Sequence, residues 1–353
     1  MSKIDNETAK VAGPGSVPGS VPGSGSVPAP APARAKLPSV KRIGGWHAIG
    51  PIVIFLAILA VVAILTPAFI GGGGLAIIAS SSAPILLLAL GQAMVLNVGS
   101  IDLSNAAIGL LGAILLALTL GPIAGLSPLI VLLATTAFGA VNGLILAFAQ
   151  VPSFALTLGT LGIFQAVALV ASGRTTVYVS SNGEGVHSLY ESGIANVPMT
   201  FWMGVLLAVA LWVLLRYTRV GRGMTAIGKN ESAAIFSAVR TRSLKVLAFA
   251  LSGFAAGLAG IAIIAQAGSA SPTGLGSDLL LPAIAAALIG GTSISGGVVN
   301  PLTVIFGALT VALVPIATTA VGIDAQAQSL VYGAVIIAVV ALTMSRNKSS
   351  IVK

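Results

Sequence analysis

The stretch NVGSIDLSNAAIG, residues 97–109, sets one carboxylate, Asp102, among small and polar residues between two long apolar runs. A lone charged side chain at that depth costs about 2.5–3.5 kcal/mol on membrane-insertion scales, so it persists where it faces protein or water. The glycine before it and the serine and asparagine after it favour a helix that is broken at this point. The stretch therefore indicates a transport protein rather than a membrane anchor.

Apolar residues dominate the whole chain: 56% of its 353 residues are hydrophobic and 7% are charged, with a mean hydropathy of +1.06. Runs of about 20 apolar residues match a hydrocarbon layer about 30 Å thick. Such runs fall at 49–70, 75–96, 103–121, 126–148, 153–172, 198–215, 246–266, 279–290, 298–319 and 325–343. This pattern predicts an all-α polytopic membrane protein with about ten transmembrane helices. Because 279–290 spans only about 18 Å as a helix, eight helices plus re-entrant pieces remain an alternative.

The net charge of +9 is concentrated in a few segments. Seven of the seventeen basic residues lie between Arg216 and Lys245, and others flank the first and last spans. Because cytoplasmic loops carry such an excess, we expect 216–245 and both termini in the cytoplasm, with the chain in the inner or plasma membrane. The segment 173–197 holds little basic charge and is expected outside. This distribution argues against nucleic acid as a partner, and the absence of cysteine leaves no thiol chemistry.

Three regions follow from composition. Residues 1–40 are rich in Pro, Gly and Ser and are expected to form a disordered cytoplasmic tail. Residues 41–345 hold the transmembrane domain, and 346–353 form a second cytoplasmic tail. Within the domain, GLGSDLLLPAIAAALIGGTSISGG at 274–297 predicts a second interrupted helix. Two similar breaks suggest an internal repeat, and discontinuous helices near a repeat interface often line transport sites.

Small residues inside the spans predict close helix packing. Gly253, Gly257 and Gly260 have the small-xxx-small spacing that lets helix backbones approach. We favour packing within the chain over a dimer seam. The TLGT run at 157–160 is interpreted in the same way.

The run GMTAIGKN, residues 223–230, nearly fits the phosphate-binding pattern GxxxxGK[ST]. Asn230 stands where a magnesium-binding hydroxyl is needed, and no strand precedes the run, so nucleotide binding is rejected. Instead, Asn230 is suited to cap a short helix that begins at Glu231. The apolar residues of that helix suit docking into a groove of a partner protein, with a position on anionic lipid as the alternative.

Four stretches in order resemble the membrane permeases of bacterial ABC importers of the monosaccharide (ribose, xylose, galactose) type. They are GSIDLS (99–104), NGLILAFAQVPSFALTLGTLGI (142–163), TRVGRGMTAIGKNESAA (218–234) and AIAAALIGGTSISGG (283–297). Three departures are visible: GSID stands for the usual GGID, Ala238 stands where glycine is usual, and GGVVN follows the second break. Permeases for nucleosides, branched-chain amino acids or a quorum-signal sugar share much of this pattern, so the solute stays open.

The resemblance implies a homo- or heterodimer of permeases in membrane lipid, two ATPase subunits that bind ATP and Mg, and an external solute-binding protein. It implies no cofactor or metal on this chain and no catalytic residue. Coupling to the ATPase falls to residues of the loop 216–245, namely Gly228, Asn230, Glu231, Ala233 and Ala234. The translocation pathway is assigned to Gln92, Asn97, Asp102, Ser104, Asn105, Thr157, Thr160, Thr292 and Ser293.

Two alternatives stay open at this stage. Asp102, Ser104 and Asn105 suit a helix cap that closes the break at least as well as direct contact with solute. An ion-coupled secondary transporter would also use broken helices and a buried aspartate, although the loop at 216–245 would then have no partner to contact.

Overall fold

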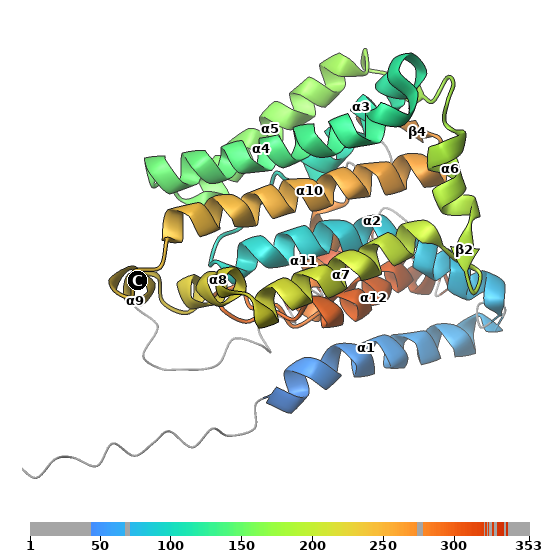
Figure 1. Cartoon of the computed structure of the whole chain (residues 1–353). Helices are drawn as coiled ribbons and strands as arrows, with labels where there is room; N and C mark the ends of the chain where they lie inside the picture. The colour runs from blue at the N-terminus through green and yellow to red at the C-terminus, as the bar shows by residue number, and fades with distance from the viewer. Residues whose placement is uncertain are drawn as a thin grey trace, which may run out of the picture. The chain divides into compact units, whose positions relative to one another are not determined.

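The computed structural model describes residues 44–67, 71–273 and 278–320, together with 322, 324, 327, 330–334 and 337. The described residues belong to one compact unit, Ile43–Lys353. The helices are α1 (Gly44–Leu65), α2 (Gly72–Asn97), α3 (Asn105–Ile123), η2 (Ala124–Leu126), α4 (Ser127–Ala149), α5 (Ser153–Ala171), α6 (Glu184–Glu191), α7 (Met199–Tyr217), α8 (Arg219–Lys229), α9 (Glu231–Phe236), α10 (Thr241–Ala267), α11 (Leu280–Ile289) and α12 (Pro301–Ala320) (Figure 1). The tails expected at 1–40 and 346–353 lie outside the described residues, as does 274–277.

The predicted all-α membrane fold is confirmed. Six helical runs in the described part of the chain are long and apolar enough to cross a membrane, and the run Asn105–Ala149 contains both α3 and α4. Two shorter apolar helices, Ile49–Leu65 and Leu280–Ile289, match the first and eighth expected spans. The tenth expected span, 325–343, lies largely outside the described residues.

Helix α10 forms the centre of the bundle, where it contacts α2, α3 and α4 (Figure 1). Its contact with α4 is so close that a Cβ atom on Gly139 would overlap the Phe249 carbonyl oxygen, and one on Gly253 would overlap that of Thr135. A Cβ on Gly260 would lie 2.8 Å from the backbone nitrogen of Ala113 on α3. The expected glycine packing on α10 is therefore confirmed as contact within the chain.

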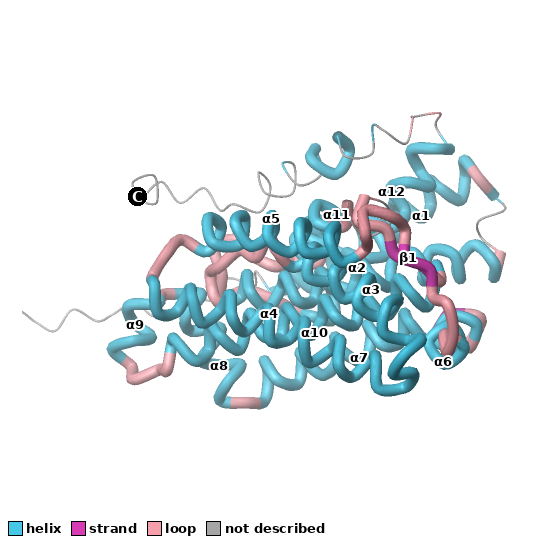
Figure 2. Tube along the Cα trace, turned by 90° about the horizontal axis from the view of Figure 1, so that it is seen from above, coloured by secondary structure: helices cyan, strands magenta, loops and turns pink. Residues whose placement is uncertain are grey.

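Helix α5 differs from its neighbours because it is hardly covered by the rest of the chain. Only 11% of its apolar window is buried, against 72% for α10. It lies at one side of the bundle, beyond α4 and away from α7 (Figures 1 and 2). Gly159 and Gly162 have no atom within 4 Å of an added Cβ. The close packing expected at TLGT is therefore wrong for Gly159, because that face of α5 meets no other helix of the chain.

Helices α2 and α11 end in the same backbone motif, which explains both predicted breaks. After α2, Gly99 N donates to Leu96 O and Ser100 N donates to Val95 O, with Gly99 at φ +74°. After α11, Gly291 at φ +87° donates to Leu288 O, and Thr292 N donates to Ala287 O. This is the Schellman motif, which satisfies the last helical carbonyls and needs a left-handed residue, usually glycine.

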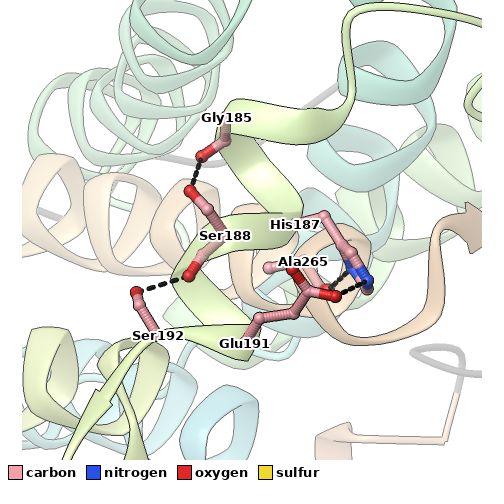
Figure 3. Close-up of polar contacts among 6 residues, drawn as sticks. All are labelled: Gly185, His187, Ser188, Glu191, Ser192 and Ala265. Atoms are coloured by element: carbon pink, nitrogen blue, oxygen red, sulfur yellow. Dashed lines mark hydrogen bonds and ion pairs between the residues drawn. The ribbon is translucent and has the colours of Figure 1, made fainter.

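At one end of the bundle, the segment between α5 and α7 folds over the end of α10. Strand β1 (Val177–Tyr178) pairs antiparallel with β4 (Ser269–Ala270), and β2 (Gly193–Ile194) pairs with β3 (Val197–Pro198). His187 links α6 to α10, because its Nδ1 lies 2.9 Å from Ala265 O of α10 (Figure 3). Its Nε2 lies 3.3 Å from Glu191 Oε1 on the same helix α6. Within α6, Ser188 Oγ donates to Gly185 O and Ser192 Oγ donates to Ser188 O (Figure 3).

Candidate functional site

Asp102 lies in the segment between α2 and α3, and its side chain is fully buried. Its Oδ1 accepts hydrogen bonds from Ser104 N at 3.0 Å and Ser104 Oγ at 2.6 Å, and its Oδ2 accepts one from Ser252 Oγ of α10 at 2.8 Å. Each of the two hydroxyls in turn accepts an amide N–H: Ser104 from Asn142 of α4 at 2.8 Å, and Ser252 from Asn105 at 2.7 Å. The carboxylate is thus the final acceptor of two converging hydrogen-bond chains.

The same segment is also held by α5. Ile101 N donates to Ser153 Oγ and Leu103 N donates to Thr157 Oγ1, both at 3.0 Å. Backbone groups that a broken helix leaves unpaired are therefore satisfied by hydroxyls of a neighbouring helix, as a membrane interior requires. Together with the Asp102 contacts, these bonds connect the first break to α3, α4, α5 and α10.

The geometry fits the capping interpretation of Asp102. Asp102, Ser104, Asn105 and Thr157 are all buried, and each makes a hydrogen bond within the first break or to the helices around it, so they form a closed joint in this conformation. Asn105 Oδ1 has no hydrogen-bond partner in the described part of the chain. The network also includes Asn142 and Ser252, which the sequence analysis did not assign. Asn142 opens the quoted NGLILAF run, but only the fold shows that it faces the break.

The other residues assigned to the pathway lie apart from this joint. Thr160 Oγ1 donates to Thr157 O at 3.3 Å, and Ser293 Oγ accepts from Ser295 N at 3.2 Å. Gln92 Nε2 and Thr292 Oγ1 are buried without a hydrogen-bond partner in the described part of the chain. Contact of any of these residues with solute stays a prediction.

Asn97 belongs to a second cluster, where α2, α8 and α11 meet. Its carbonyl oxygen accepts a hydrogen bond from Gly297 N at 3.0 Å, and its Nδ2 lies 3.4 Å from Thr225 Oγ1 of α8. A Cβ on Gly228 would overlap both Asn97 O and Gly297 N. The sequence analysis assigned Asn97 to the translocation pathway, and the contacts of Asn97 in the structure are with Thr225 of α8 and with Gly297 after α11.

The short helix α9 projects from this same end of the bundle. Asn230 Oδ1 accepts from Ala233 N at 3.0 Å, which confirms the predicted cap. Glu231 forms an ion pair with Lys245 of α10, with Oε1 and Nζ 2.6 Å apart. Ala234 is buried, whereas Ile235 is exposed and Phe236 is 91% exposed. The outward apolar surface of α9 is therefore carried by Ile235 and Phe236 and not by Ala234.

A groove of about 690 Å³ lies beside α9, between the α4–α5 connection and the start of α10. Gln150, Glu231, Arg240 and Arg242 are among the residues that line it. The guanidinium of Arg242 also lies 5.6 Å from the centre of the Phe148 ring on α4. The groove thus combines exposed basic side chains with the apolar end of α4. In the described part of the chain, no three His, Asp or Glu side chains gather as a metal site would need.

These features define a class: a multi-span α-helical membrane protein with two broken helices. Both breaks contact α8, and the short outward-facing helix α9 follows directly after it. Residues 74–340 match the family described as the branched-chain amino acid transport system / permease component. The chain belongs to this family and is a transport permease subunit of a multi-pass membrane type.

Several characterised relatives align with most of the chain. The D-allose transport system permease protein of Escherichia coli is 31% identical over 84% of this chain and 91% of its own length. The ribose import permease protein of Haemophilus influenzae is 31% identical over 81% and 89%, respectively. The autoinducer 2 import system permease protein of Yersinia enterocolitica is 32% identical over 72% and 70%. No solved structure matches the chain significantly.

Proposed function

We propose that the chain is the permease of an ABC importer that moves a monosaccharide into the cytoplasm, driven by ATP hydrolysis on separate subunits. The observation that carries this proposal is α9, a six-residue helix that projects Phe236 almost fully into solvent. An exposed apolar helix at the end of a membrane bundle suits insertion into a groove of a partner protein. A self-contained carrier has no need of such a projection.

The ion pair between Glu231 and Lys245 supplies a path from α9 to the membrane domain. Because Lys245 lies in the first turns of α10, a displaced α9 pulls on the helix at the centre of the bundle. Helix α10 in turn holds Asp102 through Ser252. The ATPase would thus act on the first break through a chain of direct contacts.

Orientation follows from the charge at the α8–α9 end. Seven basic residues lie between Arg216 and Lys245, whereas the segment that folds over the far end of α10 carries Arg174, Glu184 and Glu191. Positive charge favours the cytoplasmic side. We therefore assign α8 and α9 to the cytoplasm, with both termini, and α6 to the outside, where a solute-binding protein would dock.

The exposed side of α5 suits a solute pathway shared with a second permease copy. It presents Gly159, Gly162 and the polar Gln165, none of them covered by the chain itself. Burying the polar side chain of Gln165 in lipid costs free energy, so we expect this side chain to face water or another protein. The rest of the exposed α5 surface is apolar and includes Phe154, Leu158 and Ile163. We therefore propose only the stripe of Gly159, Gly162 and Gln165 as an addition to the pathway assigned from the sequence.

The solute class rests on the relatives, whose names specify allose, ribose and autoinducer 2. All three relatives align with most of this chain at about the same identity, and two of the three names specify a monosaccharide. We assign the chain to the import of such a monosaccharide.

The test is recovery of an ATPase subunit with the tagged chain from gently solubilised membranes. We expect vanadate-sensitive ATP hydrolysis in the purified complex. Phe236→Asp removes an exposed aromatic anchor, and loss of such an anchor costs about 2 kcal/mol or more, so ATPase recovery should fall about 30-fold. Tyr178→Asp changes another largely exposed aromatic residue, at the opposite end of the bundle, and should leave ATPase recovery unchanged. Full recovery with Phe236→Asp would contradict docking through α9.

A further inference from the structure

Four glycines from three separate segments meet at the α8–α9 end of the bundle, and we call them the glycine junction: Gly99, Gly228, Gly296 and Gly297. Gly99 follows α2, Gly228 is the second-last residue of α8, and Gly296 and Gly297 follow α11. The two predicted breaks are therefore in contact with each other and with the same helix.

The contact within the glycine junction is made by backbone atoms. A Cβ on Gly296 would lie 2.9 Å from both Gly228 Cα and Gly99 Cα, and one on Gly228 would overlap Asn97 O and Gly297 N. The hydrogen bond from Gly297 N to Asn97 O, 3.0 Å long, joins the two breaks directly. Asn97 Nδ2 adds a side-chain contact to Thr225 of α8.

Backbone packing of this kind transmits movement differently from side-chain packing. Side chains absorb a small displacement by changing rotamer, whereas backbone atoms in van der Waals contact cannot yield in that way. We propose that the glycine junction moves as one body and carries displacement of α8 to α2 and α11 together. The inference rests on the proposed function, because an ATPase on α9 supplies the displacement.

The proposal also gives a role to the run GMTAIGKN. Its second glycine is Gly228, and that position has no room for a side chain because two other segments cross it. The glycine that makes the run resemble a phosphate-binding loop is therefore required for close backbone approach.

The first experiment measures distances between spin labels, which leaves the glycine junction itself unchanged. The chain has no cysteine, so labels attach only at introduced sites. Arg222→Cys on α8 and Ser295→Cys beside the second break report across the junction, and both residues are exposed. Ser181→Cys with Ser295→Cys reports between the two ends of the bundle.

Distances are compared in the ATPase complex without nucleotide and after trapping with ATP and vanadate. We expect no shift between positions 222 and 295 and a clear shift between 181 and 295. A shift across the junction would overturn the proposal, since its parts would then move separately. Unchanged distances for both pairs would also overturn it, since the second break would not move at all. If the unlabelled chain recruits no ATPase, the proposed function itself is wrong, and this outcome is recognised without any distance measurement.

The second experiment compares two glycines of the same helix. Gly228→Ala forces α8 away from both breaks, and we expect solute uptake to fall at least about tenfold while the ATPase still copurifies through Ile235 and Phe236. Gly223→Ala is the matched control, because its Cβ would meet side chains only: the flexible end of Leu244 at 2.6 Å and Val239 Cγ1 at an ordinary contact distance of 3.5 Å. Normal uptake with Gly228→Ala, or equal losses in the two variants, would contradict the proposal.

Discussion

At the scale of single residues, Asp102 shows how a carboxylate is accommodated among apolar helices. Its two oxygens accept from Ser104 and Ser252, and those hydroxyls are themselves bound by Asn142 and Asn105. Ser104 and Asn105 are neighbours of Asp102 in the sequence, whereas Asn142 belongs to α4 and Ser252 belongs to α10. A fully buried carboxyl group is tolerated here because the two hydroxyls that donate to it are themselves oriented by further hydrogen bonds.

Ser252→Ala tests this network. The change removes one of the three bonds to Asp102 and the strongest bond of Asn105, and it should lower stability by about 1–3 kcal/mol. The apparent midpoint of thermal unfolding in detergent measures the effect. Ser127→Ala is the control, because that hydroxyl is equally buried but has no partner among the described residues. Equal behaviour of the two variants would contradict a stabilising role for the network.

Ala238 offers a prediction of the opposite sign. It follows α9 at φ +56°, and the bonds from Ala238 N to Ile235 O and from Val239 N to Ala234 O form a third Schellman motif. A left-handed alanine costs about 1–2 kcal/mol relative to its ordinary conformation, and glycine relieves most of that. We expect Ala238→Gly to raise the thermal midpoint and Ala233→Gly, inside α9, to lower it. A lower midpoint with Ala238→Gly would refute the strain.

Some roles of single residues could be predicted from the sequence and others could not. The capping role of Asn230 was predictable because the capped helix follows it directly. Ala234 was assigned to coupling together with its neighbours, but its side chain is buried, and Ile235 and Phe236 carry the exposed apolar surface. Which face of a six-residue helix points outward depends on how α8 and α10 hold it, and no local pattern reports that.

At the scale of elements, the two interrupted helices were predictable and their meeting was not. Glycine, serine and aspartate beside apolar runs are local signals, and both breaks fall where those signals lie. The convergence of Gly99, Gly228 and Gly296 joins positions that lie 129 and 68 residues apart along the chain. Such a contact is set by the packing of α2, α8 and α11, so it requires the fold.

The seam between α4 and α10 depends on Gly139. Because a Cβ there would overlap the Phe249 carbonyl oxygen, Gly139→Ala should separate the helices and cost about 1–3 kcal/mol, as overpacking does. Gly162→Ala, in the uncovered helix α5, should not lower stability, since alanine favours a helix over glycine by about 0.5–1 kcal/mol. Thermal unfolding of both variants compares the two sites, and an unchanged midpoint for Gly139→Ala would contradict the close seam.

At the scale of the whole molecule, three features fit one division of labour. The α8–α9 end offers an exposed apolar projection, and the glycine junction and Asp102 network connect that end to the broken helices. Helix α5 leaves an open face on which Gly159, Gly162 and Gln165 lie among exposed apolar side chains. Chemistry on the solute is not part of this account. We propose instead that the chain provides a movable passage, and that energy and affinity come from partner proteins.

The most direct measurement is uptake of labelled pentoses and hexoses by liposomes that contain the chain, its copurified ATPase and the solute-binding protein. The account predicts uptake that requires ATP, stops with vanadate and persists when proton and sodium gradients are collapsed. Uptake by the chain alone, driven by an ion gradient and indifferent to ATP, would contradict the account and establish a secondary transporter.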